Sequence, residues 1–243
     1  MSPSNSIALL YLHALPLDGT MWRHQQDLFS IPSYTPTLYE TGNSIEAWAK
    51  AALDTVAEDR LILVGCSVGG SCALEIAALC PERVEAMVLI GTKVARTPNP
   101  AFLSAALTLI ETRGPQIAWN TYWRPLFSQQ APQSALAIAD DIYNRRTVAE
   151  LTTGAKVFHS RPSRDTVLQT FPREVAVISG VDDIAPGLET SERQASMATR
   201  GTFHVIPDCG HYAPLEAPDQ VNDILGQVIL PILTPNGDSL NAR

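Results

Sequence analysis

The sequence predicts an α/β protein whose central sheet is mostly parallel, with helices on both faces of the sheet and a small helical lid. Three observations lead to this prediction. Short apolar runs alternate with longer amphipathic segments in the first and last parts of the chain. Residues 97–158 between them show helical periodicity and clustered aromatic side chains, without a strand pattern. An apolar fraction of 45% over 243 residues is enough for one large hydrophobic core.

Five short apolar runs are predicted as strands. Residues 7–12 form a continuous apolar run, which is typical of a strand covered on both faces. The other runs are also of strand length, and they cover residues 61–64, 84–90, 175–179 and 202–206.

Amphipathic segments between these runs are predicted as helices. Ser44 is suited to cap the start of a helix that reaches about residue 58, and Pro81 marks the end of one that reaches Leu79. Strands and helices that alternate at this spacing form right-handed βαβ units and a parallel sheet. The other predicted helices cover residues 18–29, 188–198 and 218–230.

The domain organisation follows from where this alternation is interrupted. Residues 1–96 and 159–233 are predicted to form one α/β core, and residues 97–158 are a helical insertion between them. An insertion after a parallel strand lies at the carboxyl edge of the sheet, where open α/β folds bind ligands, which favours a lid. The alternative is a helical layer that completes the core. Residues 234–243 are predicted to be a flexible tail.

Charge and composition narrow the possible partners. A net charge of −8 disfavours binding to nucleic acid. No apolar run approaches the roughly 20 residues of a membrane span, and the first residues do not resemble a secretory signal. We therefore expect a cytoplasmic monomer or homodimer that acts on a small molecule, without nucleic acid or membrane partners.

The four cysteines are too few for a disulfide framework. Cys72 and Cys80 are predicted on one helix about 12 Å apart along its axis, which is too far for a bridge. Cys209 and His211 have no second cluster with metal-ligand spacing. We expect reduced thiols, no metal site and no cofactor.

The strongest local motif is the pentapeptide Gly65-Cys-Ser-Val-Gly69, a G-x-S-x-G sequence between a predicted strand and a predicted helix. A sharp strand–turn–helix lifts its middle side chain clear of the sheet, and the close backbones require small flanking residues. The middle residue, Ser67, then lies at a helix N-terminus, where backbone N–H groups favour an anionic intermediate. Ser67 is therefore predicted to be a nucleophile.

A serine nucleophile needs a base, and the chain has five histidines. His211 follows the last predicted strand, so it lies at the same carboxyl edge of the sheet as Ser67. His204 lies within that strand, while His24 is on a helix and His159 is in or just beyond the insertion, which favours structural or surface roles. His211 is the predicted base.

The acid that orients this base is expected between Ser67 and His211 in the chain. Two aspartates, Asp182 and Asp183, follow the penultimate predicted strand. Asp183 is the preferred acid and Asp182 the alternative. A carboxylate buried beside the imidazole would fix its tautomer and stabilise the imidazolium that forms.

Two backbone donors are also needed for the developing oxyanion. Val68 follows the nucleophile directly, and Leu15 lies in the loop after the first predicted strand. These two N–H groups are predicted to form the oxyanion hole. His13 is expected to hold the same loop by hydrogen bonding.

Four stretches of the sequence resemble the α/β-hydrolase fold of serine hydrolases. They are His13-Ala-Leu-Pro-Leu-Asp-Gly19 with Trp22, Gly65-Cys-Ser-Val-Gly-Gly70, Gly180-Val-Asp-Asp183, and Cys209-Gly-His211 with Leu215-Glu-Ala-Pro218. Within that superfamily the chain is similar to small bacterial esterases and to 3-oxoadipate enol-lactonase-like proteins. The resemblance implies the α/β-hydrolase fold, a triad of Ser67, Asp183 and His211, and oxyanion donors at Leu15 and Val68.

Two departures from the family pattern are visible. Ala14 stands where the family usually has a glycine after the histidine. Only two residues separate Asp183 from Pro186, where the family usually has three, and this spacing keeps Asp182 as an alternative.

These features predict a serine hydrolase that cleaves an ester or lactone of a small, largely apolar substrate through an acyl-enzyme on Ser67. The alternatives are a C–C bond hydrolase or other chemistry on the same triad, and a ligand receptor without catalysis. A charged residue of the insertion facing Ser67 would favour a carboxylate-bearing substrate, and the candidates are Arg113, Arg124, Arg145 and Arg146. The predicted substrate pocket is lined by Trp119, Tyr122, Trp123 and Phe127.

Overall fold

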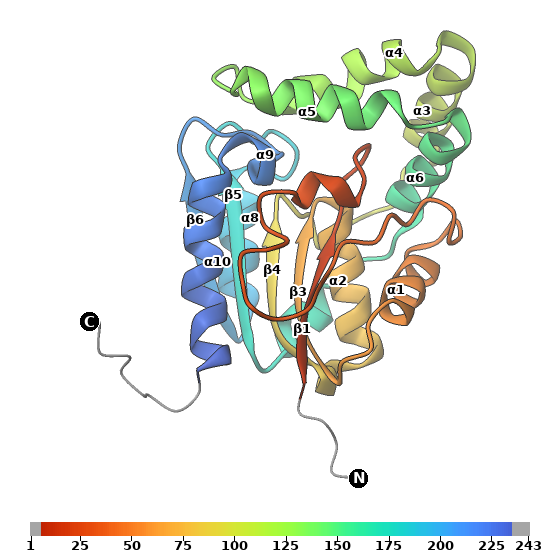
Figure 1. Ribbon diagram of the computed structural model, residues 1–243. Helices are drawn as coiled ribbons and strands as arrows, with labels where there is room; N and C mark the ends of the chain where they lie inside the picture. The colour runs from red at the N-terminus through yellow and green to blue at the C-terminus, as the bar shows by residue number, and fades with distance from the viewer. Residues whose placement is uncertain (1–5, 235–243) are drawn as a thin grey trace.

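The computed structural model describes residues 6–234, so the predicted tail lies outside the described residues apart from Thr234. Six parallel strands form one sheet in the order β2-β1-β3-β4-β5-β6 (Figure 1). This arrangement confirms the predicted fold class. The strands are β1 (Ile7–Leu12), β2 (Ser33–Tyr34), β3 (Arg60–Cys66), β4 (Val84–Ile90), β5 (Glu174–Gly180) and β6 (Arg200–Ile206).

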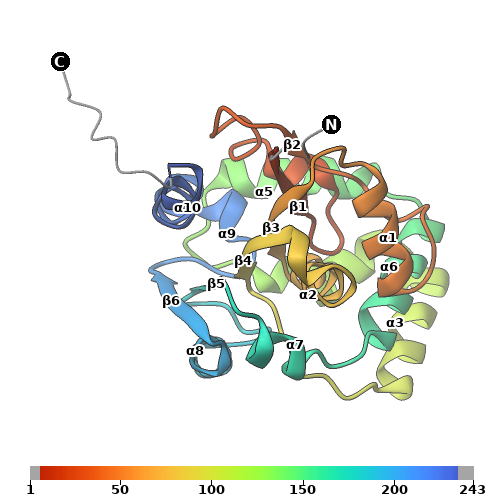
Figure 2. The same cartoon turned by 90° about the horizontal axis from the view of Figure 1, so that it is seen from below.

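Helices cover both faces of the sheet, as Figure 2 shows from below. One face packs against α1 (Ile45–Asp54), α2 (Val68–Leu79), α7 (Asp165–Thr170) and α8 (Leu188–Met197). The other face packs against α10 (Pro218–Leu233) and the 3-10 helix Gly19–Trp22, with α9 (Ala213–Glu216) near the sheet's carboxyl edge. A second 3-10 turn, Pro81–Arg83, leads into β4.

The continuous apolar runs of the strands follow from this double cover. In β1, Leu9 and Tyr11 are buried in the core on one face, while Ala8 and Leu10 are buried in the core on the other. Because successive side chains of a strand point to opposite faces, both sets must be apolar.

The helical insertion lies above the carboxyl end of the strands in Figure 1. Its last helix reaches Ser160, two residues beyond the predicted boundary at 158. The insertion contains α3 (Pro100–Arg113), α4 (Pro115–Ala118), a π-helical turn (Trp119–Trp123), a 3-10 turn (Arg124–Leu126), α5 (Gln133–Asn144) and α6 (Val148–Ser160).

The predicted helix over residues 18–29 is wrong. Only Gly19–Trp22 is helical, as a 3-10 turn, and the chain continues in turns to about residue 32. The backbone carbonyl of Gln25 accepts a hydrogen bond from the buried Tyr11 hydroxyl at 3.0 Å and one from the Leu28 N–H. These contacts hold the turn conformation against the local helical pattern.

Other boundaries also differ from the prediction. Helix α1 ends at Asp54 rather than near residue 58, because the hydroxyl and the backbone N–H of Thr55 both donate to the Ala52 carbonyl. The predictions omitted β2 and α7, which at two and six residues are too short to show a clear period.

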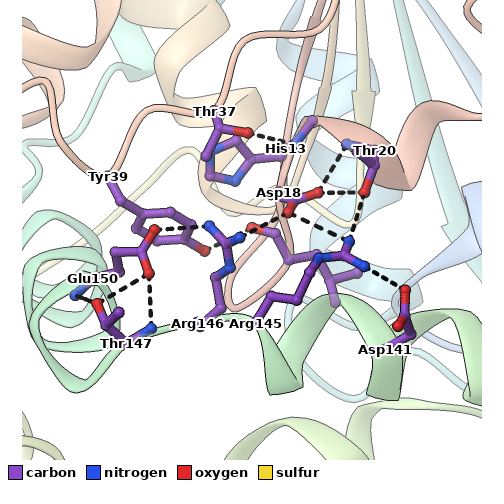
Figure 3. Close-up of polar contacts among 12 residues, drawn as sticks. His13, Asp18, Thr20, Thr37, Tyr39, Asp141, Arg145, Arg146, Thr147 and Glu150 are labelled. Carbon is purple, nitrogen blue, oxygen red and sulfur yellow. Dashed lines mark hydrogen bonds and ion pairs between the residues drawn. The ribbon is translucent and has the colours of Figure 1, made fainter.

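A polar network joins the loop after β1 to the start of α6 (Figure 3). Asp18 is buried, accepts from the Thr20 N–H at 2.9 Å and pairs with Arg146 at 3.1 Å. Arg146 also pairs with Glu150 at 2.8 Å. His13 accepts from the Leu38 N–H through Nε2 at 3.2 Å, which confirms its predicted role in holding the loop.

We expect Asp18→Ala to lower the free energy of unfolding by about 1–3 kcal/mol, because it removes both a helix cap and the partner of a buried guanidinium. Asp141→Ala is the matched control, since Asp141 also pairs with an arginine, Arg145, but its side chain is 64% exposed. Its effect should stay within about 0.5 kcal/mol. Urea unfolding measures both values, and equal losses would contradict the assigned network.

Candidate active site

Ser67 sits in the turn between β3 and α2 with a backbone conformation that is rare for a non-glycine residue, φ 55° and ψ −117°. Its N–H donates to the Ile90 carbonyl at 2.8 Å, and its own carbonyl accepts from the Thr92 hydroxyl at 3.2 Å. The end of β4 and the loop that follows it therefore fix the turn on both sides of Ser67.

The flanking glycines allow this turn to pack against the sheet. A Cβ atom at Gly69 would collide with the backbone carbonyl of Leu12 at the end of β1, and one at Gly65 would lie 2.5 Å from the backbone of Gly69 and Gly70. The G-x-S-x-G motif is thus required by close approach of backbones rather than by the serine alone.

Asp183 and His211 lie in direct contact. The Nδ1 atom of His211 is 3.0 Å from each carboxylate oxygen of Asp183, and both residues are buried. A carboxylate only accepts hydrogen bonds, so Nδ1 is the donor of this contact, and in a neutral imidazole with that tautomer Nε2 is an acceptor. The Ala185 N–H donates to Asp183 at 2.9 Å and holds the carboxylate in place.

Asp182 has a different environment from its neighbour. It is exposed, and its carboxylate accepts from the Ser128 hydroxyl at 2.5 Å. Its backbone N–H donates to the Cys209 carbonyl at 2.9 Å. The structure therefore brings Asp183, and not Asp182, to His211.

The loop that carries His211 is held by a buried carboxylate that sequence reasoning missed. Glu216 accepts backbone hydrogen bonds from Ser128 at 2.9 Å, Gly210 at 3.0 Å and Tyr212 at 2.9 Å. Burial raises the pKa of Glu216, and these three donors oppose that rise. Glu216 lies in the Leu215-Glu-Ala-Pro218 stretch, but its sequence position alone gave no sign of this role.

A second contact joins the His211 loop to the loop after β1. The hydroxyl of buried Tyr212 donates to the Leu15 carbonyl at 2.8 Å. The side chain of Leu15 lines the same cavity as Ser67 and His211. Val68 begins α2, so its N–H belongs to the helix's first turn, whose N–H groups have no partner within the helix.

Gly91 is a further positioning residue that was not predicted. It follows β4 with a φ of 54°, and a Cβ atom there would lie 2.8 Å from His211 Nδ1 and 2.9 Å from an Asp183 carboxylate oxygen. The absence of a side chain at this position makes room for the aspartate–histidine pair.

The cavity that contains Ser67 and His211 has a volume of about 260 Å³. Of the predicted pocket residues, Tyr122 and Trp123 lie in its wall. Trp119 and Phe127 do not, because Trp119 stacks on Tyr143 and Phe127 packs against Tyr212 in the core. Periodicity marks all four as apolar positions, but only one side of the turn faces the cavity.

The four arginines considered as candidates to face Ser67, with a surface role as the alternative for each, lie elsewhere. Arg145 and Arg146 pair with acids of the polar network, Arg113 is exposed, and Arg124 lies 5.9 Å from the ring of Phe127. None of the four lines the cavity with Ser67. The cations that do line it are Lys93, Arg96 and Arg161. His159 also lies in the cavity wall.

All four cysteines are free. Within residues 6–234, no group of three His, Cys, Asp or Glu side chains is placed to hold a metal ion. No helix in the same part of the chain is long and apolar enough to span a bilayer.

The chain is similar in sequence to known enzymes. Among curated proteins, 2-hydroxymuconate semialdehyde hydrolase of Pseudomonas sp. is 26% identical over 200 residues, which cover 74% of this chain and 66% of that protein. Lipase LipV of Mycobacterium tuberculosis is 26% identical over 254 residues, which cover 92% and 93% of the two chains. The match to the first relative thus spans slightly less than two thirds of its length.

Solved structures share the fold over nearly the whole chain. An esterase from Thermogutta terrifontis has a TM-score of 0.84 at 22% identity, covering 95% of this chain and 91% of that one. The enol-lactonase from Burkholderia xenovorans LB400 has a TM-score of 0.81 at 17% identity, covering 93% and 92%. The model of the alpha/beta hydrolase family matches residues 9–224. With the parallel sheet and the turn at Ser67, this match shows that the chain belongs to the alpha/beta hydrolase family.

Proposed function

We propose that the protein is a serine hydrolase that cleaves a carboxylic ester or lactone of a small substrate through an acyl-enzyme on Ser67. The observation that carries this proposal is the shared cavity. The nucleophile held at positive φ and the histidine oriented by Asp183 both open onto it.

The position of the proton in the Asp183–His211 pair supports a general-base role for His211. Asp183 holds the proton on Nδ1, so the lone pair of Nε2 is available for the Ser67 hydroxyl proton. After attack, the imidazolium formed is stabilised by the buried carboxylate and returns the proton to the leaving oxygen. A water molecule, activated in the same way, then releases the acid from Ser67.

The oxyanion of the tetrahedral intermediate would be bound by the N–H groups of Val68 and Leu15. The Val68 N–H belongs to the first turn of α2, where the helix dipole adds to its hydrogen bond. Leu15 is held from the other side by the Tyr212 hydroxyl, which couples the position of the oxyanion loop to that of the His211 loop.

The helical insertion is proposed to act as a lid over this site. It contributes Tyr122, Trp123, Leu126 and several residues of α3 and α6 to the cavity wall. The cavity volume is slightly below the range of about 300–1,000 Å³ typical of small-molecule pockets, which favours a small substrate.

A C–C bond hydrolase is the second candidate. One relative matched at 26% identity is named a 2-hydroxymuconate semialdehyde hydrolase. Parallel assays with 4-nitrophenyl esters and with an aromatic ring-fission product separate the two reactions. Higher kcat/KM on the ring-fission product would favour the C–C hydrolase.

We expect Ser67→Ala to abolish turnover of short 4-nitrophenyl esters, because the substitution removes the hydroxyl that is proposed to carry the acyl group. Initial rates of nitrophenolate release measure the effect, and an unchanged thermal unfolding midpoint shows that the variant is folded. Hydrolysis by the Ser67→Ala variant at the wild-type rate would exclude the mechanism.

Asp183→Asn should lower kcat by roughly 10³–10⁴-fold, since an amide cannot hold the correct histidine tautomer or stabilise the imidazolium. Asp182→Asn is the matched control, because it changes the same group one residue away without touching His211. We expect a change of less than about threefold for it, within the effect of a surface substitution. The reverse order of the two effects would reassign the acid.

Gly91→Ala is expected to lower kcat by at least about tenfold, because the added methyl group would displace the Asp183–His211 pair. An alanine at this position is also strained by the positive φ of the backbone, so the thermal unfolding midpoint of the variant is measured in parallel. A folded Gly91→Ala variant with wild-type kcat would show that the pair does not need this space.

A further inference from the structure

Three cations line the cavity that contains Ser67 and His211: Lys93, Arg96 and Arg161. Lys93 is exposed, whereas Arg96 is partly buried and Arg161 is 3% exposed. A buried charge in a protein is normally paired with an opposite charge, because loss of hydration is costly. The contacts of the two arginines therefore need an explanation.

Arg161 has hydrogen bonds but no counter-charge. Its Nε donates to the Ser71 hydroxyl at 2.9 Å, and its Nη1 donates to the Phe158 carbonyl. Within the described residues, no carboxylate oxygen lies within 4.0 Å of its nitrogens.

Arg96 likewise has no carboxylate oxygen within 4.0 Å of its nitrogens in the part of the chain that the structure describes. Its Nη2 donates to Nδ1 of His159 at 2.7 Å, and its buried Nε has no hydrogen-bond partner within residues 6–234. Burial and the neighbouring arginines Arg96 and Arg161 lower the pKa of His159 to about 4, so this histidine is neutral near pH 7 and adds an acceptor rather than a charge.

Both guanidinium groups lie over one aromatic ring. The Cζ atom of Arg96 is 4.6 Å and that of Arg161 is 4.0 Å from the centroid of Phe158. The ring attracts each cation but does not cancel their mutual repulsion. Burial, with Arg96 nearby, lowers the pKa of Arg161 to about 9. The pair is thus a concentrated positive charge in the wall of the cavity.

Two other partly buried arginines of this protein, by contrast, pair with acids. Arg164, three residues after Arg161, pairs with buried Glu75 at 2.6 Å, and Arg146 pairs with Asp18 and Glu150. Arg161 is more deeply buried than either of these two arginines, yet no acid pairs with it among the described residues. An anion that enters the cavity would supply the absent counter-charge.

We propose that the substrate carries a carboxylate, which binds to Arg161 and Arg96 while its ester or lactone carbonyl lies at Ser67. The proposal rests on the proposed function, because it assigns the substrate class of the same site. A planar carboxylate matches the guanidinium fork and brings the negative charge that the wall lacks. Apolar residues of the wall, such as Ala106, Ile110 and Leu126, would contact the chain between the two groups.

The test compares substrates that differ only in charge. Mono-4-nitrophenyl esters of glutaric, adipic and suberic acid carry a terminal carboxylate, and their methyl-capped counterparts are neutral. For at least one chain length, we expect kcat/KM to be about tenfold or more higher for the anion, as one charge-assisted hydrogen bond supplies this factor. Equal or higher values for the neutral ester at every length would overturn the proposal.

Variants assign the preference to the arginines. Arg161→Gln and Arg96→Gln should each lower kcat/KM for the preferred anion by about tenfold or more, and for its neutral counterpart by less than about threefold. Arg113→Gln, an exposed arginine of the insertion, is the control and should leave both values unchanged. Equal losses on both substrates in a folded Arg96→Gln variant would reduce the arginines to a structural role and overturn the proposal.

A binding measurement separates this proposal from the proposed function. Calorimetry with adipate uses the Ser67→Ala protein, in which the anion site is intact and no reaction can occur. Binding that is lost on adding Arg96→Gln supports the anion site even if Ser67 proves not to be the nucleophile. Glutarate and suberate are measured in the same way. If none of the three dicarboxylates binds, or if an alkyl phosphate of the same length binds more tightly, the carboxylate assignment is overturned.

Discussion

The turn after β3 packs closely against β1 and β4, and this packing restricts its backbone conformation. The Leu12 carbonyl leaves no space for a side chain at Gly69. The Ser67 N–H donates to the Ile90 carbonyl, and the Ser67 carbonyl accepts from the Thr92 hydroxyl, so the backbone is held on either side of Ser67. This packing holds Ser67 at positive φ, a conformation that a free turn would avoid. The position of the serine is thus set by the sheet, and the rest of the site is arranged around it.

The parallel sheet explains why residues distant in sequence meet there. Ser67 follows β3, Gly91 follows β4, Asp183 follows β5 and His211 follows β6, and these are four consecutive neighbours in the sheet. The carboxyl ends of parallel strands share one edge, so the four loops face a common space. Glu216 and Tyr212 then tie the loops to one another and to the helical insertion.

The sequence allowed the sheet, the main helices and the candidate residues Ser67 and His211 to be predicted, because each depends on a local pattern of strand, turn and helix. The choice between Asp182 and Asp183 stayed open, since adjacent residues of a loop face different directions that spacing does not record. The arginines of the cavity were missed for a similar reason. In the sequence, Arg145 and Arg146 resemble unpaired cations, but in the fold they pair with Asp18, and Arg146 also pairs with Glu150. Conversely, the sequence does not show that Arg161 contacts Ser71 in the fold and pairs with no acid among the described residues.

We propose that Ser67 is a nucleophile activated by the Asp183–His211 pair. A fluorophosphonate carrying a small neutral alkyl group tests it most directly, with intact-protein mass spectrometry and peptide mapping as the readout. We predict one adduct per chain, located on Ser67 and formed at least about a hundredfold more slowly when Asp183 is replaced by Asn. Labelling at another residue, or labelling of Ser67 at the same rate in both proteins, would contradict this account.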